Sequence, residues 1–183
     1  MIPAALIAVA ALASAPAMAS VTVVNQSITE AEVTAAQGAW CQALVDIGAA
    51  NDRSGQPAAK ALAEKVIDAA YGYQMGAVLF KPTLTVAPQT FRTTRAGALA
   101  YFVGGDAAFP KDTGFALKGW QSCRVANAAV FIAGDSATTM GNVMITGRDG
   151  KVTTVDKTWK FVKDDAGKLR IVVHHSSLPF TGS

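Results

Sequence analysis

The 183-residue sequence contains few side chains that bind transition metals, with two cysteines and two histidines in all. Cys41 and Cys123 stand far apart without a C-x-x-C spacing, so they do not form a zinc site of their own. The adjacent His174 and His175 point to opposite sides of an extended strand and cannot chelate one ion together. A His-rich zinc site is therefore excluded.

Charge is also sparse. Charged residues make up 16% of the chain, against about 25% in typical soluble domains. The formal net charge is +3, but the lysines and arginines between Lys60 and Arg170 are scattered singly. Because nucleic-acid recognition needs clustered cations, no nucleic-acid partner is expected.

The common catalytic signatures are missing as well. The sequence has no G-x-S-x-G elbow, no P-loop and no G-x-G-x-x-G motif. No carboxylate is assigned to orient a histidine, so a serine-hydrolase triad is poorly supported. Most acidic residues lie in turns and helix starts, where capping or solvated roles are typical.

The first nineteen residues carry no charge and end in Ala17-Met18-Ala19. This pattern predicts a secretory signal peptide over residues 1–19, followed by a single domain over 20–183. We therefore expect a periplasmic or secreted protein with no membrane contact after cleavage. A membrane anchor is the alternative, although Pro3 and Pro16 interrupt the apolar run. In an exported chain the two cysteines are either a disulfide or two buried thiols.

Three helices are predicted before the main strands. Thr29 and Glu32 form a capping box for a helix that ends in the turn-forming segment from Gly48 to Gly55. A second helix starts at Pro57 and ends near Gly72, and a third covers about residues 94–102.

Strand patterns fill the second half of the chain. A short strand around residues 77–83 contains Pro82, which restricts it to an edge or to the strand's end. Four strands over 120–132, 138–146, 152–162 and 169–177 are joined by hairpin turns. Helices first and an antiparallel meander last predict an α+β fold, with the helices packed on one face of a curved antiparallel sheet.

The last strand carries the candidate site. Its apolar alternation places Leu169, Ile171 and Val173 on the inner face, which would also turn His175 and Ser177 toward a pocket. His174 would then lie on the surface. The alternative is that His175 and Ser177 are structural residues that only make hydrogen bonds within the fold.

Several segments together resemble the iota-class carbonic anhydrases, a branch of the nuclear-transport-factor-2-like superfamily related to the kinase association domain. The similar segments are Ile28-Thr29-Glu30 with the helix through Trp40, Tyr71-Gly72-Tyr73, residues 78–83, Phe91-Arg92, residues 97–105, Gly114–Leu117 with Trp120, Met140-Gly141, and residues 174–180.

The resemblance implies reversible hydration of carbon dioxide to bicarbonate in a cone-shaped barrel that forms a homodimer through its sheet. By position, the family's water- and bicarbonate-holding residues are Thr83, Tyr101 and the His175/Ser177 end of the last strand. Phe80, Leu99, Phe102 and Ser176 would line the substrate site.

The resemblance implies no cofactor, although a manganese or zinc requirement stays open. His175, with an ordinary pKa near 6.5, is then the expected base. The alternative function is a non-catalytic module of the same fold that binds a small ligand or assembles oligomers.

Overall fold

A computed structural model describes residues 26–182 of the chain. The predicted signal peptide lies outside the described residues. Within residues 26–182, no helix is long and apolar enough to cross a membrane.

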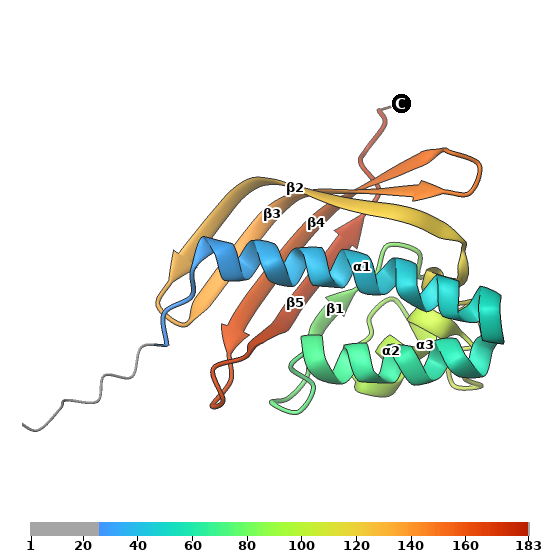
Figure 1. The fold of residues 1–183 in the computed structure, drawn as a ribbon, viewed down its shortest axis with the longest axis horizontal. Helices are drawn as coiled ribbons and strands as arrows, with labels where there is room; N and C mark the ends of the chain where they lie inside the picture. Colours follow the sequence, from blue (N-terminus) through green and yellow to red (C-terminus); the bar gives the residue numbers. More distant parts are fainter. Residues whose placement is uncertain (1–25, 183) are drawn as a thin grey trace, which may run out of the picture.

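Three helices cover one face of a five-stranded sheet (Figure 1). The elements are α1 (Glu30–Ser54), α2 (Gln56–Ala70), β1 (Leu79–Lys81), α3 (Arg95–Val103), the 3-10 helix η1 (Phe115–Leu117), β2 (Trp120–Ala133), β3 (Ser136–Gly147), β4 (Val152–Lys163) and β5 (Leu169–Ser177). The strand order β1-β5-β4-β3-β2 makes β1 and β2 the edges. β1 runs parallel to β5, and the other neighbours are antiparallel. The predicted α+β class and the four-strand meander are confirmed.

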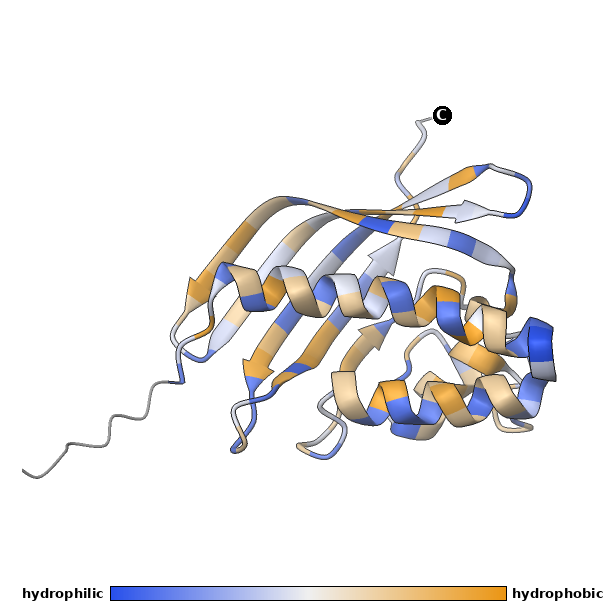
Figure 2. Ribbon diagram, viewed as in Figure 1, coloured by the Kyte–Doolittle hydropathy of each residue, from blue (hydrophilic) through white to orange (hydrophobic). Residues whose placement is uncertain are grey.

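The start of α1 follows the predicted capping box. Thr29 accepts a hydrogen bond from the backbone of Glu32, whose carboxylate accepts the Thr29 backbone N–H at 2.8 Å. The inward stripe of α1 includes Val33, Trp40 and Leu44, which pack against the sheet. Figure 2 shows the same alternation as apolar and polar bands along the helices.

The predicted break between Gly48 and Gly55 is wrong. α1 continues through Ser54 and ends at Gly55, whose φ is 78°. Gly48 is instead a packing residue, because a Cβ there would lie 2.8 Å from the backbone oxygen of Ala116 in η1. The missing side chain lets the helix approach η1 closely.

Cys41 of α1 and Cys123 of β2 form a disulfide across 82 residues of sequence. Of the two alternatives for the cysteines, the structure forms the disulfide. The bond joins α1 to the edge strand β2, which pairs within the sheet with β3 alone.

Removal of this disulfide by the double substitution Cys41→Ala and Cys123→Ala is expected to lower the free energy of unfolding by about 2–5 kcal/mol, because a long loop in the unfolded chain is released. Urea unfolding of both proteins under oxidising conditions measures the change. As a control, a reducing agent should destabilise the wild type and leave the double variant unaffected. Equal unfolding midpoints without reductant would contradict the expectation.

Candidate active site

The end of β5 has the opposite orientation to the predicted one. His174 and Ser176 are 2% and 1% exposed, whereas His175 is exposed and Ser177 is half-buried. The predicted inward orientation of His175 and Ser177 is therefore wrong, and so is the surface position predicted for His174. The interior receives the other histidine and the other serine.

A β-bulge explains this reversal. Along the ladder with β4, Phe161 pairs with Ile171, but the preceding Lys160 pairs with Val173. Val172 is therefore an extra residue in β5, and an inserted residue reverses the alternation of every residue after it. Ile171 faces the helices before the bulge, and His174 and Ser176 face them after it.

A chain of buried polar groups connects α1 to β5. Trp40 Nε1 donates to Tyr71 Oη at 2.9 Å, and Tyr71 Oη lies 2.8 Å from His174 Nδ1. On the other side of the ring, His174 Nε2 lies 2.7 Å from Lys157 Nζ, which also donates to Ser176 Oγ. The polar groups thus satisfy one another inside an aromatic core.

Burial disfavours the charged form of each titratable group in this chain. It lowers the pKa of His174 well below its usual 6.5, and the charges of Lys157 and His175 add to this effect. Burial likewise raises the pKa of Tyr71 well above 10. The pKa of Lys157 falls from 10.5 to about 7, first through burial and then through the charge of Lys81. An amine that titrates near neutrality is suited to general base catalysis.

The hydrogen-bond partners assign the protons of this chain. An indole nitrogen only donates, so the Tyr71 oxygen accepts from Trp40 and its own hydroxyl proton points at His174 Nδ1. The neutral imidazole then carries its proton on Nε2, facing Lys157. His174 Nε2–H then donates a hydrogen bond to the lone pair of the neutral Lys157 amine.

Tyr101 and Thr83 form a second polar group. Tyr101 is buried in α3, and its Oη accepts the backbone N–H of Leu84 at 3.4 Å. Burial raises the pKa of Tyr101, while hydrogen bonds with Leu84 and Thr83 act in the opposite direction. The phenol therefore keeps its proton at neutral pH and is able to donate it in a hydrogen bond.

Phe80 lies between the two polar groups. Its ring centroid is 4.3 Å from that of His174 and 5.7 Å from that of Tyr101. The parallel pairing of β1 with β5 sets Phe80 opposite His174, which explains the stack. Phe102 follows at 5.9 Å from Phe80. Of the apolar residues predicted to line the site, Phe80 and Phe102 lie beside Tyr101, and Leu99 packs half-buried against the core.

Two further polar groups border the cluster. Lys81 is half-buried, and its Nζ donates to the backbone oxygen of Ser176 at 2.8 Å. Within the described residues, Trp159 Nε1 is buried without a hydrogen-bond partner, and its ring centroid lies 5.9 Å from that of His174. A buried donor without a protein acceptor is typically bonded by water or a ligand.

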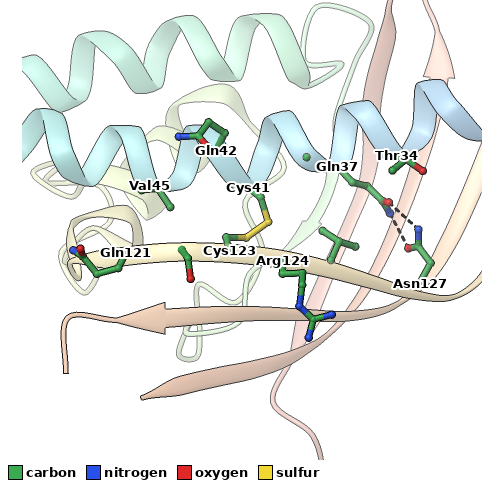
Figure 3. A pocket seen from close by; sticks show the side chains of 12 residues that line it. Thr34, Gln37, Cys41, Gln42, Val45, Gln121, Cys123, Arg124 and Asn127 are labelled. Carbon is green, nitrogen blue, oxygen red and sulfur yellow. Dashed lines mark hydrogen bonds between the residues drawn. A yellow bond between two sulfur atoms is a disulfide. The ribbon is translucent and has the colours of Figure 1, made fainter. Parts of the chain in front are cut away.

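A separate polar groove lies between α1 and β2 (Figure 3). It measures about 430 Å³ and is lined by the disulfide, by Arg124 and by Gln37 and Asn127, whose amides hydrogen-bond to each other. None of the predicted site residues lines this groove. Arg124 is its one charged residue, so it offers no base for catalysis.

Sequence reasoning missed three residues of the buried chain: Trp40, Tyr71 and Lys157. Trp40 and Tyr71 lie in segments that carry the family resemblance, but neither was predicted to belong to the site. Lys157 stands between two apolar inward positions of β4, Val155 and Trp159. A lysine in an inward-facing position of a strand was the signal available in the sequence.

The described residues contain no group of three or more His, Cys, Asp or Glu side chains arranged to hold a metal ion. Residues 31–178 match the family model for metal-independent carbonic anhydrases. A metal-independent carbonic anhydrase from Nostoc sp. is 67% identical over 158 residues, covering 86% of this chain and 77% of that protein.

The fold is similar to two solved structures. The crystal structure of an iota-carbonic anhydrase from a cyanobacterium, complexed with bicarbonate, aligns with a TM-score of 0.87 at 65% identity, covering 90% of this chain and 100% of that chain. A calcium/calmodulin-dependent protein kinase II association domain from Xanthomonas campestris aligns with a TM-score of 0.52 at 22% identity, covering 89% and 100%. The second likeness concerns the fold alone.

Proposed function

We propose, on the premise that this chain belongs to the metal-independent carbonic anhydrase family, that it hydrates carbon dioxide reversibly to bicarbonate at the buried cluster of Lys157, His174 and Ser176. The observation that carries the proposal is the Lys157 amine, buried beside His174 and Ser176 with its pKa lowered to about 7. The pKa of free water is about 15.7, so hydration at neutral pH needs a group that takes a proton as the water attacks. Lys157 supplies this base.

The proposed step balances without a further reactant. Rotation about the Cε–Nζ bond turns the lone pair of the neutral Lys157 amine away from His174 Nε2–H and toward a water molecule, and the amine takes one proton from this water while the water oxygen forms a bond to the carbon of carbon dioxide. The products are bicarbonate and the Lys157 ammonium, which returns its proton to solvent. The Trp40 and Trp159 rings, centred 4.7 Å and 5.2 Å from Nζ, stabilise the ammonium once it forms.

The remaining residues hold the substrates. Tyr101, Thr83 and Ser176 offer hydroxyl groups for the water and for the bicarbonate oxygens. His174 orients the amine through its Nε2 and takes the place predicted for His175. Phe80 and Phe102 provide the apolar surface that suits carbon dioxide.

Stopped-flow measurement of carbon dioxide hydration tests the proposal. Protein dialysed against a chelator and checked for residual metal should accelerate hydration well above buffer. Activity that appears only after zinc or manganese is added would contradict the metal-independent step. Bicarbonate binding without any hydration, with or without metal, would favour the alternative of a binding module.

The pH dependence of kcat/KM for hydration follows from the pKa of Lys157, about 7. Below this value the amine is protonated and has no lone pair, so kcat/KM should rise about tenfold per pH unit and level off above it. The rate constant is measured between about pH 5.5 and 8.5 at constant ionic strength. A flat profile over this range would rule out Lys157 as the base.

We also propose a homodimer formed through the sheet face that the helices leave uncovered. Phe131 and Met140 are 71% and 61% exposed on neighbouring strands of this face. Large exposed apolar side chains on a sheet favour association. Light scattering of the wild type should give twice the chain mass, and Met140→Lys should shift it toward the monomer; a monomeric wild type would contradict the proposal.

For location, we propose export to the periplasm or the outside of the cell. Two features support this proposal: the uncharged apolar segment before Ser20 in the sequence, and the Cys41–Cys123 disulfide, which persists in oxidising compartments. Fractionation of expressing cells, with N-terminal sequencing of the mature chain, tests both. A chain that stays in the cytoplasm with Met1 intact would contradict the proposal.

A further inference from the structure

An apolar groove opens between α1, α2 and the strands β4 and β5. It measures about 280 Å³, and its lining includes Ala36, Ala43, Val66, Ala70, Phe161 and Ile171. The one polar atom among the lining side chains is the indole nitrogen of Trp40, whose hydrogen already binds Tyr71. The groove therefore offers no side-chain hydrogen bond to water or to an ion.

A smaller cavity adjoins the groove. A second cavity of about 10 Å³ shares Trp40, Ala43 and Val66 with it and is also lined by Tyr71 and Phe102. The Phe102 ring centroid lies 5.5 Å from that of Tyr101 and 5.9 Å from that of Phe80. The lining of the groove therefore adjoins the aromatic residues that contact His174.

Trp40 forms the wall between the groove and the buried polar chain. It lines the groove, while its ring centroid lies 5.4 Å from that of His174 and 4.7 Å from Lys157 Nζ. A small molecule bound against Trp40 in the groove is therefore separated by one aromatic ring from the proposed base.

We infer that this groove is a binding and entry site for carbon dioxide, distinct from the polar side of the site where bicarbonate leaves; the inference rests on the proposed function. Carbon dioxide has no net charge and no permanent dipole, so an apolar channel admits it while excluding the anion. Bicarbonate needs cations and donors, which Lys81 supplies beside Ser176 and Thr83 supplies beside Tyr101. Separate routes would keep product from blocking the entry of substrate.

Substitutions in the groove test the inference. Ala43→Leu fills the point shared by both cavities, and Ala39→Trp covers the exposed rim without entering the core. Ala61→Leu is the matched control, because Ala61 is exposed on α2 and does not line the groove. The groove variants should lower kcat/KM by about fivefold or more, with a smaller change in kcat, whereas the control should match the wild type. Hydration and dehydration should lose kcat/KM in equal proportion, since the overall equilibrium is fixed.

Xenon provides a readout that does not depend on activity. Crystals pressurised with xenon should show the gas in the groove of the wild type and of Ala61→Leu, and not in Ala43→Leu. Absence of xenon from the wild-type groove would overturn the inference, and so would normal kcat/KM in both groove variants. A groove variant that changes oligomeric state but not rate would also overturn it, by identifying the groove as an interface between copies. An inactive wild type would instead contradict the proposed function.

Discussion

Lys157→Met is expected to lower kcat/KM for carbon dioxide hydration by about a hundredfold to ten-thousandfold, the usual contribution of a general base. Methionine keeps the length and apolar stem of the side chain but has no amine to accept a proton. Lys157 is buried among aromatic rings, and burial disfavours its charged form. The uncharged methionine side chain should therefore be tolerated at this position. Stopped-flow assays of the purified variant measure the change.

The control is Lys160→Met, three residues along the same strand. Lys160 pairs with Val173 on the opposite face of the sheet and is half-buried there. Its substitution should leave hydration within about twofold of the wild type, as is usual for surface changes away from the site. Circular dichroism confirms that both variants fold. Wild-type rates in a folded Lys157→Met would show that another group accepts the proton.

Ser176→Ala is expected to lower kcat/KM by about a hundredfold, the typical loss on removing one donor from a site that stabilises a developing anion. The matched variant is Ser177→Ala, the next residue along β5. It faces away from His174 because of the bulge at Val172, so its effect should be small. The same hydration assay compares the two.

Comparing the hydration rates of these two serine variants tests whether β5 contains the bulge in solution or alternates regularly. A large loss in Ser177→Ala with normal activity in Ser176→Ala would mean that β5 alternates regularly in solution. Deletion of Val172 is a further check, because it would remove the extra residue and leave Val173 paired with Lys160, so His174 and Ser176 should still face the core and activity should be retained.

Much of the fold was predictable because it follows from local chemistry. The capping box at Thr29 and Glu32, the proline at the start of α2 and the hairpin turns each act over a few residues. The limits of the meander strands were therefore correct to within about two residues. The family resemblance likewise depended on ordered short segments, and it predicted Thr83 and Tyr101 as site residues.

The errors came from features that depend on distant parts of the chain. The bulge at Val172 depends on how β5 pairs with β4, and nothing in the local pattern marks the inserted residue. Gly48 was predicted to begin a break after the first helix, but it lies within α1, where the missing side chain leaves room for η1 to pack closely. The role of Lys157 depends on Trp40, Tyr71 and His174, which lie far from it in sequence and come together only in the folded core.

The central claim is that bicarbonate forms on the inner side of β5, next to Lys157 and Ser176. A crystal structure of this protein soaked with bicarbonate at about pH 8, where the Lys157 amine is neutral, tests it most directly. The expected result is a planar anion within hydrogen-bonding distance of Ser176 Oγ and Tyr101 Oη, on the side of β5 that faces Phe80. An anion bound instead beside His175 and Ser177, with the inner cluster unchanged, would contradict the account.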